Sequence, residues 1–183
     1  MMAKNTWASL LFALFFFLGS CARVSVDQEL TTTIPDDFSV TLDRGFCFGH
    51  CPSYAVTIRS SGEVEYCGEG FVESLGEHRK TISVRTVAQL ARFLDEAHFF
   101  DLRDRYIGRV SDQATYFVSV QMNGRSKTVL NYAGEFADMP SVVTEIEEAI
   151  DQAAETSTWV GKGGGYDHDI SRPICENRPV PEL

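Results

Sequence analysis

Alternating apolar and polar residues recur along much of the chain, and this period of two predicts β-strands with one buried face. The predicted strands are residues 38–43, 54–59, 63–67, 115–122 and 125–132, with weaker extended segments at 71–74 and 78–84. The dipeptide Asn123-Gly124 joins the last two strands, and it is a strong signal for a two-residue hairpin. These two strands are therefore predicted to pair antiparallel.

Two further segments place their apolar residues at helical spacing, and we expect a helix over residues 86–97 and another over 140–154. Pro140 suits the first position of the second helix. The predicted stripes are Val87, Leu90, Phe93, Leu94 and Ala97, and then Val142, Ile146, Ala149, Ile150 and Ala153. Residues 101–112 are charged and predict a loop. The predicted fold is α+β: an antiparallel sheet of five to six strands with two helices on one face.

The first twenty residues have the layout of an export signal. Lys4 precedes an unbroken apolar run at residues 7–18, which is too short for a comfortable transmembrane helix. Leu18-Gly19-Ser20-Cys21 resembles a bacterial lipobox, which implies cleavage before Cys21 and acylation of that cysteine. Several acyl chains anchor a protein stably where one does not. The alternative is an ordinary signal peptide in which Cys21 is incidental.

The predicted organisation follows from this signal. Residues 1–20 are a lipoprotein signal peptide, 21–37 a lipidated cysteine and Thr-rich tether, 38–160 one α+β domain, and 161–183 a Gly/Pro-rich tail. We expect a protein of the cell envelope that is lipid-anchored and faces the periplasm. In enterobacterial lipoproteins, an Asp directly after the lipidated cysteine often retains the protein in the inner membrane. Ala22 occupies that position here, so the outer membrane is favoured in a Gram-negative host.

The net charge of the chain limits the classes of partner that it can bind. The formal net charge is −10, and an acidic domain repels the phosphates of nucleic acids and of anionic lipids. We therefore expect no nucleic-acid partner, and membrane contact through the acyl chains alone. The chemistry of a protein partner is left open.

Five cysteines are present. If Cys21 takes lipid, four remain, and an even number in an oxidising compartment suggests two disulfides with three possible pairings. A local link between Cys47 and Cys51 would pin the loop between two strands. A link between Cys67 and Cys175 would tie the tail to the polar face of the sheet. In the alternative, Cys175 pairs with another molecule.

The stretch Cys47-Phe48-Gly49-His50-Cys51-Pro52-Ser53-Tyr54 is the most specific motif of the chain. It resembles the C-F-G-x-C-P-x-Y pattern of a bacterial family of unknown function, DUF6438, and the likeness extends over about residues 38–160. Membership would imply the fold and an envelope location, but no activity. Cys67, Cys175 and the tail depart from the family pattern.

The same motif allows a chemical alternative. C-x-x-x-C-P resembles the copper-binding segment of SCO-type assembly factors, and Cys47, His50 and Cys51 offer soft thiolate and imidazole ligands. In that family, however, a helix follows the cysteines, whereas a strand is predicted here. Two further clusters of acidic residues are weaker candidates for a cation site. The first, Asp101, Asp104 and Asp112, lacks the spacing of a calcium-binding loop. The second, Tyr166-Asp167-His168-Asp169, lies in a Gly-rich tail and lacks rigidity.

No nucleophile elbow, zinc-protease motif, P-loop or dinucleotide fingerprint occurs in the sequence. We therefore assign no catalytic residue and expect no cofactor. The leading hypothesis is a non-enzymatic binding or scaffold module of the envelope. The alternatives are a periplasmic copper or thiol-redox factor that uses Cys47, His50 and Cys51, and a small hydrolase.

Overall fold

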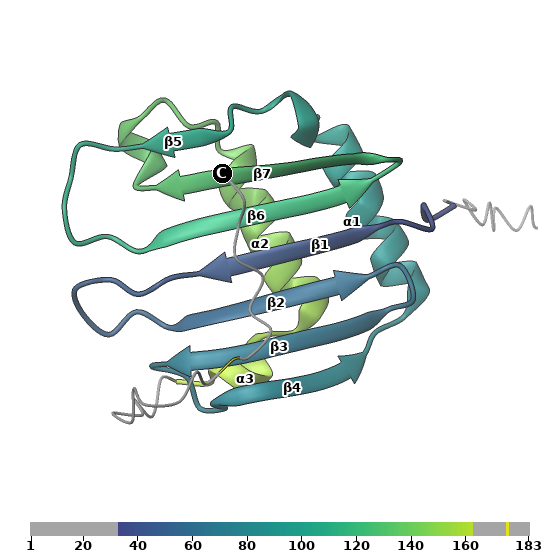
Figure 1. The fold of residues 1–183 in the computed structure, drawn as a ribbon, viewed down its shortest axis with the longest axis horizontal. Coiled ribbons are helices and arrows are strands. Elements are labelled where there is room, and N and C mark those ends of the chain that lie inside the picture. Colours follow the sequence, from purple (N-terminus) through teal and green to yellow (C-terminus); the bar gives the residue numbers. More distant parts are fainter. Residues whose placement is uncertain (1–32, 163–174, 176–183) are drawn as a thin grey trace, which may run out of the picture. The chain divides into compact units, whose positions relative to one another are not determined.

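The computed structural model describes residues 33–162 and Cys175. The strands are β1 (Ser39–Arg44), β2 (Ser53–Arg59), β3 (Glu63–Gly70), β4 (Gly76–Thr81), β5 (Arg105–Ile107), β6 (Thr115–Met122) and β7 (Arg125–Tyr132). The helices are α1 (Val84–Glu96), α2 (Val142–Ala154) and the short α3 (Ser157–Val160), with 3-10 turns η1 (Phe99–Asp101) and η2 (Gly134–Phe136). The strands form one sheet in the order β4-β3-β2-β1-β6-β7-β5, and α1 and α2 cover one of its faces (Figure 1).

The middle of the sheet is antiparallel, and β1 is its central strand, between β2 and β6. The predicted hairpin is confirmed, since Met122 pairs with Arg125 across the turn. Asn123 and Gly124 have φ angles of 56° and 71°, which only a few residue types adopt without strain and which a type I′ turn requires.

The core lies between the sheet and the two helices. Alternation along the central strands turns Val40 and Leu42 of β1 toward the helices, where they meet Ile146 and Ile150 of α2, and all four are fully buried. Burying each such side chain contributes about 1.5–3 kcal/mol. The N-terminus of α1 is capped by Ser83, whose Oγ accepts a hydrogen bond from the N–H of Thr86 at 3.1 Å, so the helix begins two residues earlier than predicted.

The α+β class is confirmed, but the prediction of a purely antiparallel sheet of five to six strands is not exact. Seven strands are present in the described part of the chain, and β5 runs parallel to β7 at the edge. This strand lies inside the segment that was predicted to be a loop. It has three residues and only Tyr106 is buried, so it is too short to show an alternating pattern.

Smaller differences concern where elements begin and end. β3 extends to Gly70 and β4 covers Gly76–Thr81, whereas residues 71–74 do not form a strand. The second predicted helix starts at Val142, after Pro140, and α3 follows as a third helix. Within the described residues, no helix combines the length and apolar character needed to cross a bilayer. The predicted signal peptide, most of the tether and most of the tail lie outside the described residues.

Candidate functional site

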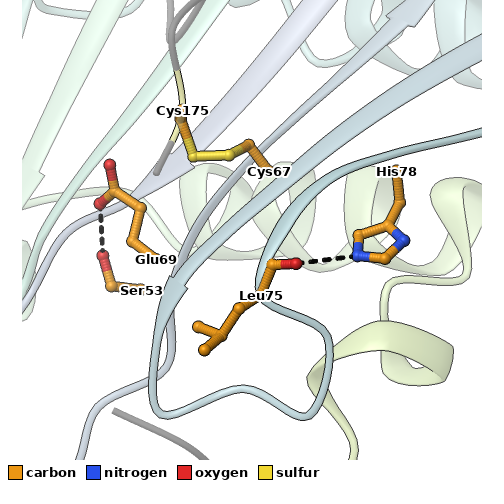
Figure 2. The surroundings of a disulfide bond; sticks show 6 residues. All are labelled: Ser53, Cys67, Glu69, Leu75, His78 and Cys175. Carbon is orange, nitrogen blue, oxygen red and sulfur yellow. Dashed lines mark hydrogen bonds between the residues drawn. A yellow bond between two sulfur atoms is a disulfide. The ribbon is translucent and has the colours of Figure 1, made fainter. Parts of the chain in front are cut away.

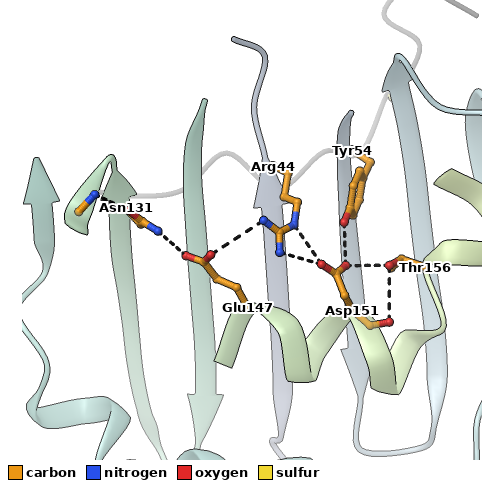
Figure 3. Close-up of polar contacts among 7 residues, drawn as sticks. Arg44, Tyr54, Asn131, Glu147, Asp151 and Thr156 are labelled. Atoms are coloured by element: carbon orange, nitrogen blue, oxygen red, sulfur yellow. Dashed lines mark hydrogen bonds and ion pairs between the residues drawn. The ribbon is translucent and has the colours of Figure 1, made fainter. Parts of the chain in front are cut away.

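A polar network lies between the sheet and α2 where β1 ends (Figure 3). Arg44 is the last residue of β1, and its Nε and Nη2 donate hydrogen bonds of 3.0 and 2.8 Å to Oδ2 of Asp151. One helical turn earlier, Oε2 of Glu147 lies 3.9 Å from Nη1 of Arg44. Two carboxylates spaced four residues apart on α2 therefore hold the end of β1.

The same carboxylates also bind neighbouring elements. Tyr54 of β2 donates its hydroxyl to Oδ1 of Asp151 at 2.8 Å, and Thr156 donates to the same oxygen at 2.8 Å. Asn131 of β7 donates its Nδ2 to Oε1 of Glu147 at 2.8 Å. The network thus links three strands to one helix, as Figure 3 shows.

Burial and neighbouring charges shift the pKa values of three groups in this network. Burial raises the pKa of Tyr54, and the neighbouring charge of Asp151 raises it further, so the hydroxyl stays a proton donor. Burial alone would lower the pKa of Arg44, but its carboxylate partners hold it above the ordinary value. Burial also raises the pKa of Glu147, against the hydrogen bond from Asn131 and the charge of Arg44. Each group has a partner inside the network, which therefore works as a structural clamp.

The clamp fixes both ends of the loop at residues 45–52, because Arg44 precedes this loop and Tyr54 follows it. Within the loop, the N–H of Gly45 donates to the carbonyl of Thr115 at 2.9 Å, and the N–H of Phe48 donates to the carbonyl of Asp112 at 3.2 Å. A disulfide joins Cys47 and Cys51, with their Cα atoms 5.7 Å apart. The loop is therefore held at its ends, at its middle and across its tip.

Exposed apolar side chains gather at this end of the sheet. Among the described residues, five of the six large apolar side chains that are exposed come from the β1–β2 loop, from β5 with its following loop, and from η2. We call these residues the loop-end surface: Phe46, Phe48, Ile107, Val110 and Phe136. Phe48 is the most accessible, with 89 % of its surface exposed. Exposed apolar residues that lie at one end of a domain are candidates for an interaction site.

A second disulfide lies on the helix-free face of the sheet (Figure 2). Cys67 belongs to β3, and because Val64 and Tyr66 point into the core, alternation turns Cys67 to the other face. It is bonded to Cys175, with a Cα–Cα distance of 6.0 Å. Close by, Ser53 donates its hydroxyl to Glu69 at 3.1 Å.

The structure brings together some predicted site residues and separates others. Both cysteine pairs lie at disulfide distance, in the pairing favoured from the sequence. His50 packs edge-on against Phe71, with 5.1 Å between ring centroids. No group of three or more His, Cys, Asp or Glu among the described residues is arranged to hold a metal ion. Cys21 and residues 166–169 lie outside the described residues, so lipidation at Cys21 stays a prediction.

Sequence reasoning missed the clamp, although a signal for it was present. Arg44 continues the inward-facing series of Val40 and Leu42 along β1. Glu147 and Asp151 are spaced one turn apart beside the buried residues of α2. Charged residues at buried positions of a strand and of a helix predict that the two elements meet there as an ion pair.

Comparison with known proteins identifies a family match that includes the β1–β2 loop. The model of a protein family described as a domain of unknown function (DUF6438) matches residues 38–154. The match runs from the residue before β1 to the end of α2, and so includes the β1–β2 loop and most of the clamp. The curated proteins yield no match to the chain.

Proposed function

The chain belongs to the DUF6438 family, and we propose that it is a non-enzymatic binding module that is lipid-anchored in the bacterial cell envelope. Its binding site is the loop-end surface, and its principal contact is Phe48. The ligand is a protein or other envelope component that offers an apolar pocket.

The observation that carries this proposal is the presentation of Phe48. Aromatic residues that enter partner pockets contribute a large share of binding energy at interfaces. Affinity increases further when the residue is already held in its bound geometry, because less conformational entropy is lost on association. Phe48 is almost fully exposed, while its loop is fixed by a disulfide and by backbone hydrogen bonds to Asp112 and to Thr115 at the start of β6.

The anchor part of the proposal rests on the sequence of Leu18-Gly19-Ser20-Cys21. Cells grown with an alkyne analogue of palmitate should label the wild-type chain and the Cys175→Ser variant, but not Cys21→Ser. Labelling of Cys21→Ser at the wild-type level would contradict the anchor without affecting the proposed binding surface.

The binding part can be tested by site-specific photo-crosslinking in intact cells. A benzoylphenylalanine residue is placed at position 48, at 136 or, as a matched control, at Val84, which is 60 % exposed on α1. We expect one adduct of the same mass from positions 48 and 136, and none from 84. Equal adducts from all three positions, or none from 48, would refute a specific loop-end interaction.

The copper or thiol-redox alternative makes a different demand. It needs Cys47 and Cys51 as free thiols, whereas they form a disulfide in the structure. Membrane-extracted protein can be alkylated and then mapped by mass spectrometry without reduction. Alkylated Cys47 and Cys51 would favour the alternative, and an intact link would favour the binding module.

A further inference from the structure

The first half of β7 forms an open edge of the sheet. On one side, β7 pairs with β6 over its whole length, but on the other side β5 pairs only with Leu130, Asn131 and Tyr132. The chain that leads into β5 comes from η1 and joins the sheet only at Arg105 (Figure 1). Residues 125–128 therefore have no neighbouring strand on this side within the described part of the chain.

The open edge presents backbone hydrogen-bonding groups. The N–H of Leu130 donates to the carbonyl of Asp104, and the carbonyl of Tyr132 accepts from Gly108, both at 2.8 Å and both on the β5 side. Because these groups alternate along a strand, those of Ser126 and Thr128 face the same side. Outside the sheet ladder, no backbone hydrogen bond between described residues uses them.

A groove of about 530 Å³ lies along this edge. We call it the β7 edge groove, and its principal side chains are Phe100, Asp104, Arg105, Arg125 and Lys127. The guanidinium of Arg125 lies over the ring of Phe100, 4.1 Å from its centroid. A ligand would thus meet an aromatic wall, an open strand and several cations.

The groove is positively charged in an otherwise acidic protein. Lys127 binds Asp104, with 2.7 Å between Nζ and Oδ1, and this hydrogen bond lowers the pKa of Asp104. Among the described residues, neither Arg105 nor Arg125 forms an ion pair with a carboxylate. The four charged side chains of the groove, Asp104, Arg105, Arg125 and Lys127, thus carry a net charge of +2 in a chain whose net charge is −10.

The opposite edge of the sheet is different. β4 is also an edge strand, but Arg79 lies 3.2 Å from a carboxylate oxygen of Glu65, and Lys80 lies 2.9 Å from one of Glu155. Both of these cations on β4 thus have a carboxylate partner in the domain, although Glu65 also pairs with Arg59. This edge offers a strand whose Arg and Lys side chains are already engaged in ion pairs and so serves as an internal control.

We propose that the β7 edge groove binds an acidic peptide segment of a partner protein in extended conformation. The peptide adds a strand beside β7 and hydrogen-bonds the backbone of Ser126 and Thr128, in the manner of β-strand addition. Its carboxylates contact Arg105 and Arg125, whose charges offset the repulsion from the rest of the domain. The site is separate from the loop-end surface, and the inference does not rest on the function proposed above.

Charged residues at a sheet edge can also serve only to prevent aggregation between sheets. The experiment must therefore distinguish binding of a peptide from such a protective role. The probe is a fluorescein-labelled ten-residue peptide of alternating Thr and Glu, measured by fluorescence anisotropy with the full-length protein in neutral detergent. We expect saturable binding that Arg125→Glu weakens about tenfold or more, while Arg79→Glu on β4 changes it less than about twofold. Both variants change the net charge equally, and thermal melting verifies that each is folded.

Two further probes test the mode of binding. A peptide with Lys in place of Glu should not bind. A Thr-Glu peptide with a methyl group on every backbone nitrogen keeps its charge but loses all its backbone donors, and we expect it to bind at least about tenfold more weakly. Equal binding of the N-methylated peptide would overturn strand addition. Absence of binding by the Thr-Glu peptide, or equal weakening by Arg125→Glu and Arg79→Glu, would overturn the site itself.

Discussion

The hydroxyl of Tyr54 donates a hydrogen bond of 2.8 Å to Oδ1 of Asp151 and so joins β2 to α2. On the adjacent strand β3, Tyr66 pairs with Val56 and so lies diagonally next to Tyr54, with 5.5 Å between the two ring centroids. Its ring stacks on Trp159, yet its buried hydroxyl has no hydrogen-bond partner among the described residues. Two buried tyrosines side by side thus have opposite polar environments.

Removing the two hydroxyls should therefore have opposite effects on stability. Tyr54→Phe breaks a hydrogen bond to a charged group, and we expect the free energy of unfolding to fall by about 1.5–3 kcal/mol. Tyr66→Phe removes an unsatisfied buried hydroxyl, so the free energy of unfolding should stay the same or rise by up to about 1 kcal/mol. Urea denaturation measures both. A larger loss in Tyr66→Phe than in Tyr54→Phe would contradict the structure.

Alkaline pH should destabilise the fold through the same residues. Burial raises the pKa of Tyr54 and of Tyr66 above the ordinary tyrosine value of about 10. As the pH rises above about 10, the unfolded chain loses these protons first, so the free energy of unfolding falls. Absorbance at 295 nm should show that at least two of the six tyrosines ionise only when the protein unfolds. Ionisation of all six in the folded state would refute this.

The two disulfides should differ in their contribution to stability. The link between Cys67 and Cys175 closes a loop with a sequence separation of 108, against 4 for Cys47 and Cys51. Loop entropy gives about 5 kcal/mol for the long link and about 2 kcal/mol for the short one. Double serine variants, C67S/C175S and C47S/C51S, compared by denaturation, should follow this order. The reverse order would show that strain or residual structure outweighs loop entropy.

Asp151 should be the most sensitive residue of the clamp. Asp151→Ala leaves Arg44, Tyr54 and Thr156 without their shared acceptor, and removing one partner of a buried ion pair costs about 3–5 kcal/mol. Asp151 is partly exposed, so we expect about 3 kcal/mol. Glu96→Ala, which removes an exposed partner of Arg92 on α1, is the control and should cost less than about 1 kcal/mol. Similar losses in both variants would argue against the clamp.

The parts of the fold that the sequence predicted are those with a repeated local signal. The hairpin of β6 and β7 combines alternation with Asn123-Gly124, and both helices have a continuous apolar stripe. β5 has only three residues, and its first residue, Arg105, pairs with Leu130, which lies 25 positions later in the sequence. Its conformation as a strand is therefore determined by tertiary packing. The parallel pairing was unpredictable for that reason.

The candidate site was predictable only in part. The sequence left three disulfide pairings open and only favoured the one that the structure shows. The loop-end surface assembles from three segments distant in sequence. Nothing in the local pattern brings Phe48 to the same end as Phe136. Phe48 lies in the β1–β2 loop, and its backbone is hydrogen-bonded to Asp112 of another loop. The exposure of Phe48 therefore depends on a tertiary contact that the local sequence does not reveal.

The central position of β1 also has a mechanical consequence. A tensile force on the N-terminal segment would reach the domain at residues 36–38, which are hydrogen-bonded to the β2–β3 and β6–β7 turns. It would then act along the axis of β1, which is hydrogen-bonded on both sides along its length. Such a force is carried by two hydrogen-bonded ladders at once, whereas a pull along the edge strand β4 would load only its single ladder to β3. A domain held by its N-terminus would therefore resist extraction far better than one held through β4.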